Sequence, residues 1–323
     1  MQIDQLLRRL FWRVRRQLRP SADNDPIVWV EAPVAESRPG LSTGRLRPTV
    51  IAFVATLSVL AAGYAFLVAA NSQAPLDTNR PAAADGGGSH AAAAASALLA
   101  PVAEDAASGA EEIPLLPNGR RLRGERIAAG TREAATAFVK VAATLGGDDP
   151  AVRDASDALA AGDIAAGRDA LVRFNTRIAA GRVRLGSGAT FISAVAAAAA
   201  VACEAEEAAL REAARANSGG MVGPGAQAQF SHGRGVAFGW LMLLRGALAD
   251  FPEIAEATVV EAAIPLDALA AAAERQPLFL FNGGDRAPWA PAHLEDQAAE
   301  FARAAAGARA LALAARKPAV AAP

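Results

Sequence analysis

The chain has 323 residues, of which 53% are hydrophobic and 5% aromatic, and its formal net charge is −1. Beyond residue 48 it carries 23 basic and 28 acidic residues, which excludes a protein that neutralises nucleic-acid phosphates, so we expect no nucleic-acid partner. The single cysteine, Cys203, excludes an intramolecular disulfide and a cysteine-pair metal site, and its Ala-rich surroundings predict a buried, inert thiol.

Residues 1–48 are predicted to form a cytoplasmic segment that begins with a basic amphipathic helix. Apolar residues recur at helical spacing over residues 2–19, and arginines occupy the other face. Such a helix favours association with an anionic membrane leaflet. The alternative is that the arginines only set the topology of the chain.

The stretch Thr49–Ala70 contains no charged residue and is predicted to cross a membrane as a single helix. Its length corresponds to about 33 Å of helix, against a hydrocarbon core of about 30 Å. Nine arginines precede it and only Arg80 follows before Arg120, so the N-terminus is predicted to stay in the cytoplasm. A cleaved signal peptide and a buried core helix are the alternatives, and the length and position of the run disfavour the first.

Small side chains recur along one side of this span and would let two copies of the helix approach closely. They are Ala55, Ser58, Ala62, Ala65 and Ala69. The pattern predicts a homo-oligomer through the span, although alanine is common throughout the chain.

Residues 71–112 are rich in Ala, Gly and Ser, and we predict a low-complexity linker there. Residues 113–318 show helical periodicity and are predicted to form an exported, all-α bundle or array packed through alanine. The expected helices cover about 131–145, 151–161, 163–181, 188–216, 230–251, 265–275 and 291–316.

Four features set the expected boundaries inside this domain. Thr131 is placed as a helix cap, and Pro265 is placed at the start of a helix. Phe230–Phe251 is the most apolar stretch and is expected to be the central helix, since its two arginines disfavour a second membrane span. Leu278–Phe281 favours an extended segment, but no partner strand is recognisable, so no sheet is expected.

Polar and aromatic residues gather at the start of the expected central helix and in the loop before the last helix. They are His232, Arg234, Asn282, Asp285, Trp289 and His293. Histidines near carboxylates can bind metals or transfer protons, whereas turns, helix starts and packing explain the same residues structurally. We favour contact with a ligand or partner and predict no catalytic residue, metal or cofactor, because no phosphate loop, nucleophile elbow or metalloprotease motif occurs.

Two runs carry a resemblance to a known family. FSHGRGVAFGWLMLLRGALADF and PLFLFNGGDRAPWAPAHLEDQAAEFARAAAGAR resemble the C-terminal half of a bacterial family called domain of unknown function 2333. The resemblance covers about residues 45–316. It implies a bacterial cell-envelope protein with a short cytoplasmic start, one span and a mainly helical exported domain, and it brings no site residues.

These observations predict a non-enzymatic adaptor or scaffold in the bacterial inner membrane, with its helical domain in the periplasm and another envelope protein as partner. The alternative is a periplasmic ligand-binding or hydrolytic domain. Its pocket would lie between the central helix and the 282–293 loop.

Overall fold

A computed structural model gives the fold. The structure describes Phe53 and residues 55–63, 76–80, 87–108, 119–147, 149–217, 220–277, 280–282 and 291–317. The basic helix predicted within 1–48 and the candidate residues Asp285 and Trp289 lie outside these ranges.

The chain divides into two compact units, Met1–Ser58 and Val59–Pro323. In the first unit the described residues, Phe53 and 55–58, are helical and exposed, and the helix continues to Gly63 in the second. Most of the predicted span Thr49–Ala70 lies outside the described residues. Within them, one helix, Gly188–Ala216, is long and apolar enough to cross a membrane, and it belongs to the core of the second unit.

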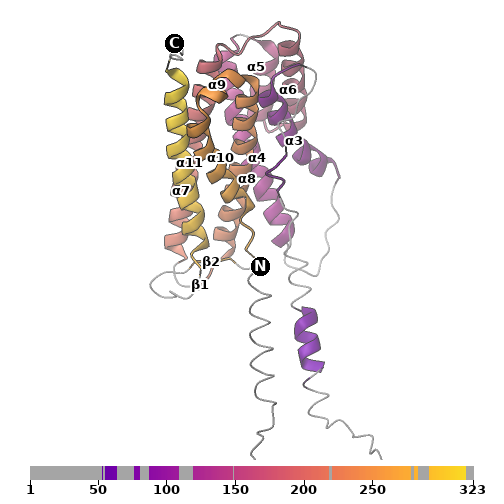
Figure 1. The fold of residues 1–323 in the computed structure, drawn as a ribbon. Coiled ribbons are helices and arrows are strands. Elements are labelled where there is room, and N and C mark those ends of the chain that lie inside the picture. The colour runs from indigo at the N-terminus through magenta and orange to yellow at the C-terminus, as the bar shows by residue number, and fades with distance from the viewer. Residues whose placement is uncertain are drawn as a thin grey trace, which may run out of the picture. The chain divides into compact units, whose positions relative to one another are not determined.

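The second unit is an almost entirely helical bundle in which the long helices lie side by side (Figure 1). This confirms the predicted all-α class. The helices of the described part are α3 His90–Ser108, α4 Gly119–Leu145, α5 Pro150–Ala160, α6 Ile164–Ala179, α7 Gly188–Ala216, α8 Pro224–Asp250, α9 Pro252–Ala257, α10 Val259–Glu274 and α11 His293–Arg316.

Helix α8 is the centre of the bundle, as the sequence predicts. It packs against α3, α4, α7, α10 and α11. Trp240, Leu241 and Leu243 are fully buried in its middle. The helix begins at Pro224, earlier than expected, because proline suits the first helical position after the extended Gly223.

Glycine lets neighbouring helices approach α8 unusually closely. A Cβ atom on Gly235 would collide with the carbonyl oxygen of Ile127 on α4. On the α3 side, a Cβ atom on Gly246 would lie 2.7 Å from the Cα atom of Ala91. Backbones at such distances exclude any side chain between them, so the Gly-rich run of α8 fixes two of its helix contacts.

The prediction of a linker over residues 71–112 is wrong for the part that forms α3. Ala91, Ala95 and Leu99 are fully buried and belong to the main hydrophobic core. Ser89, just before the helix, caps it: its hydroxyl accepts a hydrogen bond from the Ala92 N–H at 3.1 Å. A poly-alanine run has the highest helix propensity, and here its small side chains also let α3 pack against α8.

Two helix starts also differ from the expectation. Helix α4 begins at Gly119, and Thr131 lies inside it, where its hydroxyl donates to the carbonyl oxygen of Ala128 at 2.9 Å. Helix α10 begins at Val259 and contains Pro265 in its interior. Pro265 is buried against Gly307 of α11, so a tertiary contact offsets the proline's missing backbone donor.

The expectation that no sheet forms is also wrong. Strands β1, Gly220–Met221, and β2, Phe281–Asn282, pair antiparallel with Gly220 opposite Asn282. This two-residue ladder joins the turn before α8 to the segment before α11. The partner was not recognisable because two residues carry no alternating pattern.

Candidate functional site

Three helices bring two carboxylates to opposite sides of one histidine. His232 of α8 places its Nδ1 atom 3.2 Å from Glu206 Oε2 of α7. Its Nε2 atom lies 3.3 Å from Glu133 Oε2 of α4. Gln229, one turn earlier on α8, donates its amide N–H to Glu206 Oε1 at 2.7 Å, so both oxygens of the buried carboxylate are engaged.

This arrangement favours the charged imidazolium. Hydrogen bonds to Glu133 and Glu206 raise the pKa of His232 to about 9, although partial burial acts in the opposite direction. The hydrogen bond from His232 likewise lowers the pKa of Glu133. The cluster therefore places a charged imidazolium between two carboxyl side chains at neutral pH, and it ties α4, α7 and α8 together.

The cluster is poorly suited to metal binding or proton abstraction. Its carboxylates lie against different ring nitrogens and do not converge on one point. The described residues contain no group of three or more His, Cys, Asp or Glu side chains that could hold a metal ion. A histidine with a pKa of about 9 is also protonated at neutral pH, so it is a poor general base there.

The sequence analysis predicts His232 as a site residue but does not predict its partners, Glu133 and Glu206. Glu206 stands among charged residues in the second half of its helix, which predicts exposure to solvent, yet it is buried at 5% exposure. The signal was present, because Glu206 continues the buried stripe Ala199, Cys203 and Leu210 at spacings of four, three and four residues. Glu133 lies on α4, and the packing of α4 against α8 joins residues far apart in the sequence, so no local pattern indicates this contact.

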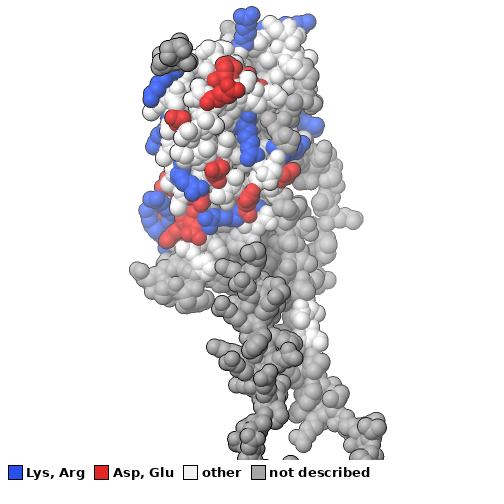
Figure 2. Space-filling view, in the orientation of Figure 1, with Lys and Arg blue, Asp and Glu red and all other residues white. Residues whose placement is uncertain are grey.

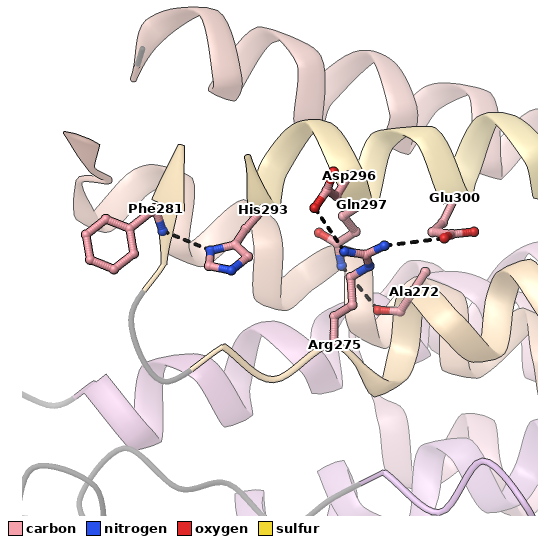
Figure 3. Close-up of polar contacts among 7 residues, drawn as sticks. All are labelled: Ala272, Arg275, Phe281, His293, Asp296, Gln297 and Glu300. Atoms are coloured by element: carbon pink, nitrogen blue, oxygen red, sulfur yellow. Dashed lines mark hydrogen bonds and ion pairs between the residues drawn. The ribbon is translucent and has the colours of Figure 1, made fainter. Parts of the chain in front are cut away.

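Two other predicted site residues, Asn282 and His293, lie at the junction of β2 and α11, and Figure 3 shows His293. His293 Nδ1 accepts a hydrogen bond from the Phe281 N–H at 3.0 Å, and burial lowers the pKa of its imidazole. Asn282 is fully buried and donates its amide N–H to the carbonyl oxygen of Ala214 at 2.8 Å. Both side chains thus connect the end of the sheet segment to neighbouring backbone.

An ion-pair network lies next to this junction (Figure 3). Arg275, just after α10, contacts Asp296 at 3.2 Å and Glu300 at 3.3 Å on α11. Beside it, Gln297 donates to the carbonyl oxygen of Ala272 at 3.4 Å. These contacts fasten the C-terminal end of α10 to the first turns of α11.

The candidate residues described by the structure do not form one pocket. His232 contacts α4 and α7, whereas the buried Arg234, two residues later, donates its Nε–H to the carbonyl oxygen of Ala273 on α10 at 2.9 Å. Asn282 and His293 serve the junction at the end of the bundle. The geometry gives these four residues structural contacts and no common substrate position.

Large apolar side chains are exposed elsewhere on the bundle, over three neighbouring helices. We call them the α10–α11 apolar surface: Val201 on α7, Val259, Val260 and Ile264 on α10, and Leu313 on α11. Figure 2 shows acidic and basic side chains over both the upper and the lower parts of the described bundle, with the densest group over the lower part. Exposed apolar side chains that lie close together are typical of protein interaction sites.

These residues lie on helices that pack against one another, since α11 packs against both α10 and α7. Helices α10 and α11 pack together, and Ile264 would lie within 2.8 Å of a Cβ atom on Gly307. Helix α11 also packs against α7, where Arg309 pairs with Glu204. Val201 and Leu313 each lie one turn from this ion pair, towards the C-terminal end of α11.

Comparison of the chain with protein-family models, curated proteins and solved structures finds no match. The resemblance to domain of unknown function 2333 therefore stays a prediction.

Proposed function

We propose that the protein is a non-enzymatic adaptor of the bacterial inner membrane, whose helical domain faces the periplasm and binds another envelope protein. The predicted span Thr49–Ala70 is the anchor, and the exposed apolar side chains of residues 55–63 support that assignment. The arginine bias before the span supports the orientation.

The observation that carries the proposal is the α10–α11 apolar surface. Val260 and Leu313 are 72% and 64% exposed on a bundle whose other large apolar side chains are mostly buried. Burying such side chains against a partner is worth about 25 cal/mol per Å² of apolar area. The four polar candidates that the structure describes support the same conclusion, because their contacts are internal to the fold.

The first experiment tests the docking surface in cells. A photo-reactive amino acid is placed at Val260 or at Leu313, and a matched control is placed at the exposed Asp157 on α5. We expect one envelope protein to crosslink from the two surface positions and not from the control. Crosslinking that is absent, or equal at all three positions, overturns the adaptor proposal.

A second measurement links the crosslink to function. Val260→Asp and Leu313→Asp should remove the crosslink and fail to complement a deletion strain, with unchanged thermal unfolding because both side chains are already exposed. Full complementation by both variants would argue against this surface. Alkaline phosphatase fused after Pro323 tests the orientation, since it is active only when exported.

A further inference from the structure

A groove between α3 and α6 has the composition of a binding site. It encloses a cavity of about 590 Å³, within the range typical of ligand pockets. Its lining residues are Arg80, Ala93, Ser96, Ala97, Ala100, Arg168, Val172, Asn175, Thr176 and Ala179. Alanines and a valine form the apolar part, and the polar part contains two arginines and no acidic residue.

The charge of this groove is uncompensated within the described residues. Neither Arg80 nor Arg168 has an ion-pair partner there, whereas Arg177 on the same helix pairs with Asp149 at 2.7 Å. Two unpaired guanidinium groups that line one cavity therefore favour an anionic occupant.

The groove is also held in shape by the fold. Asn175 accepts a hydrogen bond from the Ser89 N–H at 2.7 Å, which fixes its side chain at the N-terminal end of α3. Arg168 lies seven residues earlier on α6, about 10 Å along the helix. The groove thus has a polar amide end, an apolar middle along α3 and a cationic end.

Chain connectivity keeps the groove close to the membrane. The segment 76–80 docks on the bundle: Leu76 packs on the core, the Thr78 hydroxyl donates to Glu274, and Arg245 donates to the Thr78 carbonyl oxygen. Only five residues separate Leu76 from Ala70, the end of the predicted span. Fully extended, the six Cα–Cα steps from Ala70 to Leu76 reach about 22 Å. Chain connectivity therefore limits how far the docked segment that contains Arg80 can lie from the end of the span.

We infer that the groove between α3 and α6 binds an anionic phospholipid, with the phosphate against Arg80 and Arg168 and an acyl chain along Ala93, Ala97 and Ala100. The inference rests on the membrane anchor of the proposed function. Basic side chains near a bilayer attract anionic lipid head groups, and the alanine wall offers an apolar surface for a chain. An acidic peptide could bind the same two arginines, but nothing in its chemistry favours a site next to the membrane span.

The test uses the full chain purified in detergent and native mass spectrometry. Phosphatidylglycerol, the anionic probe, is titrated against zwitterionic phosphatidylcholine of the same acyl chains. We expect selective retention of phosphatidylglycerol, and about a 25-fold loss of its affinity in the double variant Arg80→Gln, Arg168→Gln. Arg182→Gln, an exposed arginine outside the groove, is the matched charge control and should retain the lipid.

Several outcomes overturn the inference. Equal retention of the two lipids, or retention unaffected by the double variant, removes the groove as a lipid site. Displacement by millimolar inorganic phosphate would make it a free-anion site, and stronger displacement by an acidic peptide than by excess lipid would make it a peptide site. Both results contradict lipid binding.

Membrane anchoring is measured separately by carbonate extraction of cell membranes. Release of the protein overturns the anchor and the lipid inference together. Retention in the membrane with no lipid selectivity overturns the lipid inference alone and leaves the adaptor proposal standing.

Discussion

The cluster around His232 makes the stability of the bundle depend on pH in a definite direction. The folded state raises the pKa of this imidazole from 6.5 to about 9, so it holds the proton more tightly than the unfolded chain does. The stabilisation is complete below pH 6.5 and is lost as the pH rises through 9. At 1.36 kcal/mol per pKa unit the rise corresponds to about 3 kcal/mol.

The measured effect should be smaller than this. Glu133 is 58% exposed, and solvent screens its interaction with the imidazolium. Glu206 is buried and shielded from solvent, and its contact is therefore retained in larger part. We expect the free energy of unfolding to fall by about 2 kcal/mol between pH 6 and pH 9.5 through His232.

The assay compares wild type with His232→Gln. Denaturant unfolding of the full chain in detergent is followed at several pH values, and the difference between the two proteins should shrink by about 2 kcal/mol as the pH rises. The chain has three histidines, so ¹³C-labelled imidazole signals can be assigned with single variants and titrated directly. An imidazole of His232 that titrates near pH 6.5, or identical pH profiles for both proteins, would refute the reasoning.

Three further predictions concern packing. Gly235→Ala should lower the free energy of unfolding by about 1–3 kcal/mol because its Cβ atom meets α4 backbone, whereas Gly225→Ala on the same helix has open space and should change it little in a thermal melt. Leu99→Ala should lower the free energy of unfolding by about 2–5 kcal/mol in a denaturant titration, because Leu99 is fully buried; a change near zero would show that this segment is a linker. Burial raises the pKa of the Cys203 thiol to about 12, so maleimide should label it only after unfolding, and rapid labelling of the native protein would contradict its burial.

Local chemistry in the sequence was enough to place several helices. Ser187 caps α7 by accepting a hydrogen bond from the Thr190 N–H, and the expected range 188–216 agrees with the structure. Asp163 caps α6 by accepting a hydrogen bond from the Ala166 N–H at 2.9 Å. Such boundaries depend on side chains within a few residues of one another, so a single sequence carries them.

The contacts that each side chain makes could be identified only from the tertiary structure. Glu206 looks like an ordinary exposed charge until α8 supplies His232 and Gln229, and Asn282 looks like a turn residue until α7 supplies a carbonyl oxygen. The cationic groove likewise exists only because α3 and α6 pack together and Arg80 lies beside them.

Helical periodicity and capping are local, so the amino-acid pattern alone indicates a mainly helical protein and the apolar stretch at its centre. Whether the alanine run of α3 is a core helix or a tether depends on contacts with distant parts of the chain. Poly-alanine has the same composition in both roles, and its place depends on whether glycines such as Gly246, distant in sequence, leave room for a close backbone contact.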